Sequence, residues 1–199
     1  MEVIKITVGM FQANAYLLKV NKHVIIVDPG AEFSRIDKNI LEDEVVDAII
    51  LTHGHIDHIG AVNEFVNKYK CPLYISEKEK DFLTNPDFNL SLGNNYTVKE
   101  KPLFFSSLTN IKDFTFKIYE TPGHTVGSVV ILYKNIMFSG DTLFAGSIGR
   151  TDLYSGDMTQ MQHSLTLFKH LDRNIVLYPG HGPNTTINDE LKTNPYLRY

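Results

Sequence analysis

The hexapeptide His53-Gly54-His55-Ile56-Asp57-His58 places four potential metal ligands within six residues. It follows the apolar run Val45 to Leu51, which reads as a buried strand. In an extended segment, residues two apart point the same way, so the first two histidines can bind one metal ion together. Asp57 and His58 come at a turn and can face a second position. Imidazole and carboxylate groups suit zinc or iron, so this density of ligands favours a metal site over an ordinary polar turn.

Three further ligand candidates stand at turns that follow other apolar stretches. They are His124 in the segment TPGHT, Asp141 in SGDT and His181 in PGHG. Each lies close to a glycine, which allows the tight backbone approach that a loop around a site requires. Taken singly, each residue fits an ordinary turn equally well. Together with the hexapeptide, they make seven ligand-type residues at predicted strand ends.

The periodicity of the remaining chain predicts a mixture of strands and helices. Strands are predicted at residues 3–7, 15–20, 24–28, 45–51, 72–75, 114–119, 128–132, 136–139 and 175–178. Helices are predicted at residues 34–41, 59–69, 77–83, 158–171 and 188–192. Ser76 and Glu79 have the spacing of a capping box at the start of the third helix. Residues 84–98, rich in Asn, Pro and Gly, are expected to form a surface loop.

Composition limits the classes of protein that this chain can represent. Its 199 residues are 43% hydrophobic and 21% charged, which fits one globular domain covering residues 1–199. The net charge of −4 argues against nucleic acid as a partner. No apolar run reaches the ~18 residues of a membrane helix, and no signal peptide is recognised, so a cytoplasmic protein without membrane contact is expected. A single cysteine, Cys71, excludes an internal disulfide and is expected to be buried.

The ligand motifs resemble those of the metallo-β-lactamase superfamily, whose signature is H-x-H-x-D-H followed by separate His, Asp and His motifs. The match extends from Asp28 to His181. Within the superfamily, the chain looks most like the short glyoxalase-II-like proteins, which resemble hydroxyacylglutathione hydrolase. The segments that carry this likeness are residues 121–128, 139–144, 146–152 and 179–183. The resemblance implies an α+β fold, a single-domain αββα sandwich with metals at one edge of the sheets.

The resemblance also implies a role for each ligand candidate. The first metal would be held by His53, His55 and His124, the second by Asp57, His58 and His181, and Asp141 would bridge the two. Asp28 would support the metal loop by hydrogen bonding. Two divalent ions are expected, most simply zinc, and iron or a mixed zinc–iron pair suits the same ligands. Asp57 would also have a catalytic role, orienting a metal-bridging hydroxide.

The activity implied is hydrolysis of a 2-hydroxyacyl thioester, a small acyl-thiol substrate, by a monomer or homodimer. The sequence departs from full-length glyoxalase II, because the chain ends at Tyr199, soon after His181, without a C-terminal helical domain for glutathione. Glutathione is therefore in doubt as the thiol. Arg150 matches a basic substrate contact in the long enzymes. An ion pair with Asp152 or Asp157 explains Arg150 equally well.

Several alternatives fit the same residues. A persulfide dioxygenase of this fold would bind one Fe(II) at His53, His124 and Asp141, which is the two-histidine, one-carboxylate set of Fe(II) oxygenases. A lactonase would use the same hydroxide, and a non-catalytic metal-binding module is a further hypothesis. A nuclease is disfavoured by the net charge, and an exported β-lactamase by the missing signal peptide. The 84–98 loop is predicted to border the substrate entrance.

Overall fold

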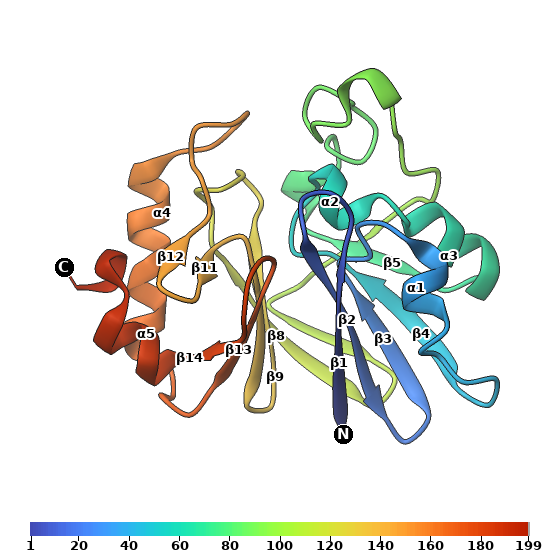
Figure 1. The fold of residues 1–199 in the computed structure, drawn as a ribbon, viewed down its shortest axis with the longest axis horizontal. Coiled ribbons are helices and arrows are strands. Elements are labelled where there is room, and N and C mark those ends of the chain that lie inside the picture. The colour runs from blue at the N-terminus through green and yellow to red at the C-terminus, as the bar shows by residue number, and fades with distance from the viewer. Residues whose placement is uncertain (199) are drawn as a thin grey trace. The chain divides into compact units, whose positions relative to one another are not determined.

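The computed structural model describes residues 1–198 and divides into two compact units, Met1–Phe105 and Ser106–Tyr199. Each unit is built around one six-stranded sheet with helices packed against it (Figure 1). The first unit carries four of the seven candidate ligands, and the second carries the other three. No helix among the described residues is both long enough and apolar enough to cross a membrane.

The sheet of the first unit has the strand order β1-β2-β3-β4-β5-β6. Its strands are β1 (Glu2–Val8), β2 (Ala13–Val20), β3 (His23–Val27), β4 (Val45–Ile50), β5 (Leu73–Ile75) and β6 (Leu103–Phe104). The first three strands are antiparallel, and the pairs from β3 to β6 are parallel. The parallel arrangement places the chain ends of β3 and β4 at the same edge of the sheet. Asp28 follows β3 at that edge, and the histidine hexapeptide follows β4.

Helices cover one face of this first sheet. They are α1 (Phe33–Asp37), α2 (Ile56–Ile59) and α3 (Val62–Tyr69), with short 3-10 helices at Glu77–Glu79 and Leu92–Asn94. Ile36 of α1 and Phe65 of α3 belong to one hydrophobic core with residues of β2, β3 and β4. The ring of Phe65 packs edge-on against Phe33 at a centroid distance of 4.7 Å. This burial of apolar surface holds the strand that leads into the histidine loop.

The second unit has the strand order β14-β13-β10-β9-β8-β7, in which β10 and β13 are parallel. These strands are β7 (Leu108–Ile111), β8 (Phe114–Glu120), β9 (Val129–Tyr133), β10 (Ile136–Gly140), β13 (Val176–Pro179) and β14 (Thr185–Thr186). A small hairpin is formed by β11 (Leu143–Phe144) and β12 (Ser147–Ile148). The helices are α4 (Met158–Leu165) and α5 (Ile187–Thr193), with 3-10 turns at Thr166–His170 and Pro195–Leu197. The segments with His124, Asp141 and His181 follow β8, β10 and β13.

Most predicted elements are present, but three details of the prediction were wrong. The helix expected at 59–69 is interrupted at Gly60, where a Cβ atom would come within 2.3 Å of the Gly30 carbonyl oxygen. The capping box of Ser76 and Glu79 does not form; only a 3-10 turn follows Ser76, whose side chain makes no cap bond. The helix expected at 158–171 is α-helical only from Met158 to Leu165 and continues as a 3-10 turn at Thr166–His170.

Candidate metal centre

The histidine loop of the first unit brings three imidazole rings together. His53, His55 and His58 are all buried. The ring centroid of His53 lies 4.9 Å from that of His55 and 4.2 Å from that of His58. Asp57 is partly exposed, and its Oδ2 lies 3.9 Å from Nε2 of His58. The four ligand-type residues of the hexapeptide therefore form one cluster within this unit.

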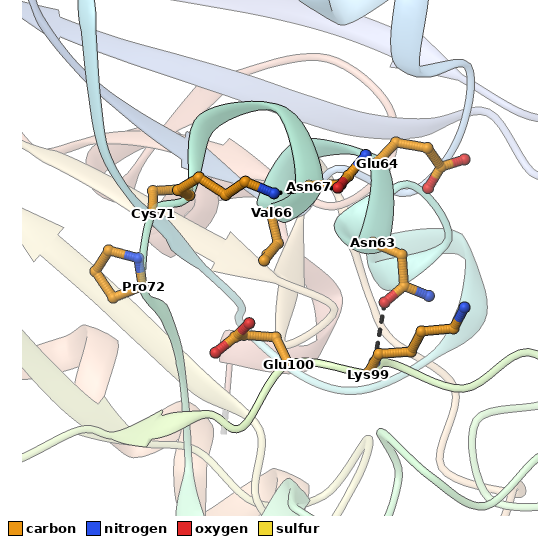
Figure 2. A pocket seen from close by; sticks show the side chains of 9 residues that line it. Asn63, Glu64, Val66, Asn67, Cys71, Pro72, Lys99 and Glu100 are labelled. Atoms are coloured by element: carbon orange, nitrogen blue, oxygen red, sulfur yellow. Dashed lines mark hydrogen bonds between the residues drawn. The ribbon is translucent and has the colours of Figure 1, made fainter.

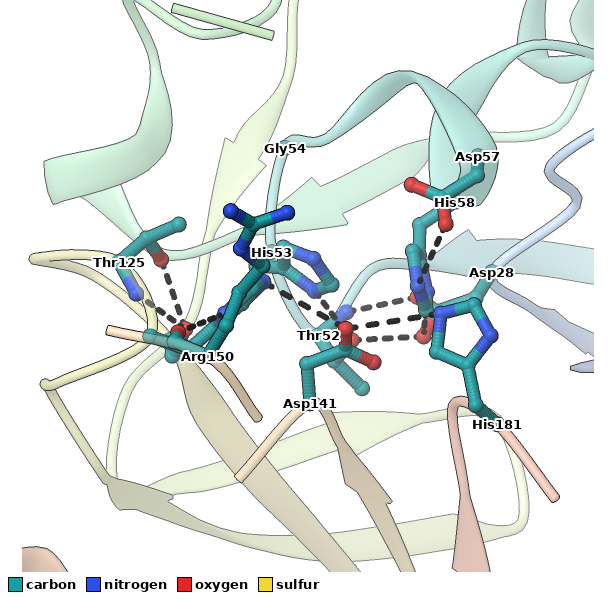
Figure 3. A network of polar contacts seen from close by, with 12 residues as sticks. Asp28, Thr52, His53, Gly54, Asp57, His58, Thr125, Asp141, Arg150 and His181 are labelled. Atoms are coloured by element: carbon teal, nitrogen blue, oxygen red, sulfur yellow. Dashed lines mark hydrogen bonds and ion pairs between the residues drawn. The ribbon is translucent and has the colours of Figure 1, made fainter. Parts of the chain in front are cut away.

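Asp28 organises this cluster through its two carboxylate oxygens (Figure 3). Oδ1 accepts from the backbone N–H of Thr52 at 2.8 Å, and Oδ2 accepts from the Thr52 hydroxyl at 2.6 Å. Nδ1 of His58 lies 3.0 Å from Oδ2. Because a carboxylate only accepts, Nδ1 carries the proton, and Nε2 has the lone pair that could bind a metal ion. The supporting contacts expected of Asp28 are thus present.

Thr52 fixes the position of the imidazole proton of His53 in the same way. Its hydroxyl lies 3.1 Å from Nδ1 of His53 and already donates its proton to Asp28. The hydroxyl oxygen can therefore accept from Nδ1–H, and Nε2 again has the lone pair that could bind a metal ion. Two of the three imidazoles in this loop therefore carry their proton on Nδ1, which is the tautomer that can bind a metal ion through Nε2.

Two residues that were not predicted to belong to this site hold the backbone of the loop. The buried Glu79 accepts from the Gly54 N–H at 2.8 Å, and the Asn89 carbonyl accepts from the Ile56 N–H at 2.8 Å. Gly54 is required here, since a Cβ atom would lie 2.4 Å from Cβ of Phe82. Glu79 was interpreted as a helix-capping residue, and no local signal links it to Gly54, 25 positions earlier.

The ligand candidates of the second unit also converge. Oδ2 of Asp141 lies 3.5 Å from Nε2 of His124. The same oxygen lies 3.6 Å from Nε2 of His181 (Figure 3). These distances exceed a hydrogen bond. Two ligands bound about 2.1 Å from one tetrahedral ion would lie roughly 3.4 Å apart, so the spacing fits shared coordination. His124 and Asp141 are buried, whereas His181 is partly exposed, with the Phe144 ring edge-on against it at 5.8 Å.

Backbone geometry around His124 fixes its ring. Nδ1 lies 2.7 Å from the Arg150 carbonyl oxygen, which can only accept, so Nδ1 carries the proton and Nε2 could bind a metal ion. The preceding Gly123 has a φ of +144°, and a Cβ atom there would lie 2.5 Å from the backbone of Met161. Glycine is the residue that permits this approach of the turn to α4.

The side chain of Arg150 pairs with Asp152. Nε and Nη2 of the guanidinium donate to the two Asp152 oxygens at 2.7 and 2.8 Å, and both side chains are exposed. The hydrogen bond from Arg150 lowers the pKa of Asp152 to about 2. Asp157 instead caps α4 by accepting from the Gln160 N–H. Of the two ion pairs considered for Arg150, the one with Asp152 is present.

Cys71 is buried, as predicted, and burial raises the pKa of its thiol to about 11. It lies on the wall of a cavity of about 770 Å³ in the first unit (Figure 2). That cavity mixes charges of both signs, including Glu64 and Lys99, and the Lys99 N–H donates to Asn63 Oδ1 at 2.9 Å. A thiol held in the neutral form is a poor nucleophile.

The family model of the metallo-beta-lactamase superfamily matches residues 8–181 of this chain. The chain belongs to the metallo-β-lactamase superfamily. Two curated relatives resemble it over nearly their whole length. The probable metallo-hydrolase YqgX of Bacillus subtilis is 37% identical, covering 97% of this chain and 96% of YqgX. The hydroxyacylglutathione hydrolase GloC of Haemophilus influenzae is 32% identical, covering 98% and 97%.

Solved structures agree with this assignment. The BLEG-1 B3 metallo-β-lactamase is 37% identical with a TM-score of 0.93, and the match covers 100% of both chains. TTHA1623, crystallised in a di-iron-bound form, is 31% identical with a TM-score of 0.85 over 98% of this chain and 100% of its own. The predicted metallo-β-lactamase fold is therefore confirmed. The chain is a metallo-hydrolase of this superfamily, and its histidine and aspartate clusters fit a site for divalent metal ions.

Proposed function

We propose that this protein is a dinuclear metallo-hydrolase that cleaves 2-hydroxyacyl thioesters into a hydroxy acid and a free thiol. The proposal assigns one ion to His53, His55 and His124, a second to Asp57, His58 and His181, and Asp141 to both. The observation that carries it is the position of Asp141, whose Oδ2 faces Nε2 of both His124 and His181 at 3.5 and 3.6 Å. A carboxylate oxygen placed between two imidazoles is suited to serve two ions.

Several features support this assignment without fixing the substrate. The imidazoles of His53, His58 and His124 have acceptors at Nδ1, so their Nε2 atoms are prepared for metal. TTHA1623 holds two irons, and GloC is named a hydroxyacylglutathione hydrolase. Zinc is the expected metal, and iron or a zinc–iron pair suits the same ligands. When bound, two divalent ions supply an activated water and stabilise a developing oxyanion.

The residues of the chain contribute positioning and proton handling. Asp57, the least buried of the ligands in the first unit, is proposed to orient the attacking water through a carboxylate oxygen. Asp28 and Thr52 keep the imidazoles of His58 and His53 protonated on Nδ1. Arg150 is proposed as a contact for a substrate carboxylate, which would compete with Asp152 for the exposed guanidinium.

Elemental mass spectrometry on protein purified without chelators, followed by a thioester panel, tests the proposal. We expect about two ions per chain and hydrolysis of 2-hydroxyacyl thioesters. The variant Asp141→Ala should lose metal and activity together, whereas Asp113→Ala, at an exposed turn of the same unit, should retain both. One iron per chain with oxygen uptake on a persulfide would support the dioxygenase instead. Two ions with activity on lactones alone would favour a lactonase, and two tightly held ions in Asp141→Ala would contradict the ligand assignment.

A further inference from the structure

A second cavity, of about 360 Å³, opens beside Asp57 within the first unit. One wall is the turn between β1 and β2, with Met10 and Phe11. The other is the 84–98 loop, with Leu90 and Leu92. Because Asp57 belongs to the proposed metal centre, a group in this cavity lies next to the reacting end of the substrate.

The turn between β1 and β2 exposes two large side chains to solvent. Gly9 adopts a φ of +68°, and its carbonyl oxygen accepts from both the backbone N–H and the side-chain amide of Gln12, at 3.2 and 2.8 Å. These bonds close a tight turn that leaves Met10 86% and Phe11 60% exposed. Two large apolar side chains at the mouth of a cavity favour an apolar ligand over water.

The opposite wall is held together by hydrogen bonds of its own. The buried side-chain amide of Asn89 donates to the carbonyls of Phe82 and Tyr96, and its Oδ1 accepts from the Ser91 N–H. The Asn89 carbonyl accepts from Ile56, so this loop is attached directly to the histidine loop. The framework holds Leu92 61% exposed with a φ of +39°, a conformation that leucine seldom adopts. A hydrogen-bonded loop that presents an exposed leucine beside the cavity indicates a binding surface.

The charge of the cavity decides which part of a substrate fits it. Among the described residues that line it, Asp57 is ionisable and none is Lys or Arg. A glutathionyl group carries two carboxylates and an ammonium, and would need cationic partners for those carboxylates. We propose that this cavity binds the uncharged, apolar chain of the acyl group beyond its hydroxyl-bearing carbon. The inference rests on the proposed thioester hydrolysis and narrows its substrates to 2-hydroxyacyl groups with an aliphatic or aromatic chain.

A matched pair of substrates tests this inference in the metal-loaded protein. Lactoyl and 2-hydroxyhexanoyl thioesters of one small uncharged thiol differ by three methylene groups. Each fully buried methylene is worth about fourfold in the rate constant, and the cavity is open, so kcat/KM should favour the longer chain by about tenfold. Leu92→Ala should lower this ratio to about threefold or less. Leu41→Ala, which removes an equally exposed leucine elsewhere in the unit, should leave the ratio unchanged.

Binding of ketone analogues, in which a methylene replaces the thioester sulfur, separates this inference from the proposed function. The longer analogue should bind about tenfold more tightly than the shorter one, and Leu92→Ala should lower this difference to about threefold or less. Hydrolysis with equal kcat/KM for both substrates would overturn the inference and leave the proposed function standing. No hydrolysis of either thioester by protein with two bound ions would overturn the proposed function. Equal affinity for both analogues would overturn the acyl-chain site independently.

Discussion

Replacing Asp28 by asparagine should weaken metal binding, although it replaces none of the seven candidate ligands. The effect should act through His58, whose Nδ1 lies against the Asp28 carboxylate. Oδ2 of Asp28 accepts from the Thr52 hydroxyl at 2.6 Å and from Nδ1 of His58 at 3.0 Å. Asparagine offers one acceptor oxygen. If that oxygen keeps the Thr52 N–H, its NH₂ group faces two donors. Nδ1 of His58 then loses the acceptor that fixes its proton, so Nε2 is no longer held as the ligating atom.

The magnitude follows from the bonds lost. Removing the hydrogen-bond partner of a metal-bound histidine typically costs 10–100-fold in metal affinity, or about 1.4–2.7 kcal/mol. The metal-free protein should also lose stability, because two hydrogen bonds to a buried carboxylate are worth about 1.5–3 kcal/mol each before relaxation. We therefore expect Asp28→Asn to lower the free energy of unfolding by roughly 3 kcal/mol.

Chelator competition measures the metal affinity, and urea denaturation of the metal-free protein measures the stability. The control is Asp37→Asn, which removes a carboxylate bound to Lys68 and Tyr69 at 2.7 Å, outside the histidine loop. The control should leave metal affinity unchanged and cost less stability. The reasoning is refuted if Asp28→Asn binds metal as tightly as the wild type, or if it loses no more stability than the control.

Three further predictions follow from buried and charged groups. Glu79→Ala should lower the free energy of unfolding by about 2 kcal/mol in urea denaturation, and Glu79→Gln should cost less, because glutamine keeps an acceptor for the Gly54 N–H. Cys71 should react with iodoacetamide at pH 8 about 100-fold more slowly in the native than in the unfolded chain, because its pKa rises from 9.0 to about 11; equal rates would contradict the burial. The lowered pKa of Asp152 means that its ion pair with Arg150 is complete above about pH 4 and is lost as the pH falls toward 2. Arg150→Ala should return that pKa toward 3.8, which a carboxyl-carbon NMR titration would detect.

The candidate ligands could be proposed from the sequence because their signals are local. The hexapeptide follows the apolar strand β4, and His124, Asp141 and His181 stand beside glycines after β8, β10 and β13. Loops that follow strands often carry binding and catalytic residues, so residue type and position point to the same function. Long, strongly patterned strands were found for the same reason, whereas β6, β11, β12 and β14 have two residues each and offer no periodicity.

The residues that support the ligands were harder to predict, because their contacts join positions distant in sequence. Glu79 has the spacing of a helix cap, yet it accepts from Gly54, and Asn89 reaches Ile56 from a segment that reads as an irregular loop. Gly60 interrupts a run with helical spacing because the Gly30 loop lies against it. In each case tertiary contact overrides a local preference.

The two units prepare their histidines with different kinds of acceptor, and this difference determines which substitutions act on the metal. In the first unit the acceptor for His58 is the side chain of Asp28, so a change of that side chain changes the tautomer. In the second unit the acceptor for His124 is the backbone carbonyl of Arg150. Replacing the Arg150 side chain leaves that carbonyl in place, and the guanidinium is engaged with Asp152 instead. An arginine adjacent to the ligands in the fold can therefore be altered to probe substrate binding while the ring of His124 keeps its orientation.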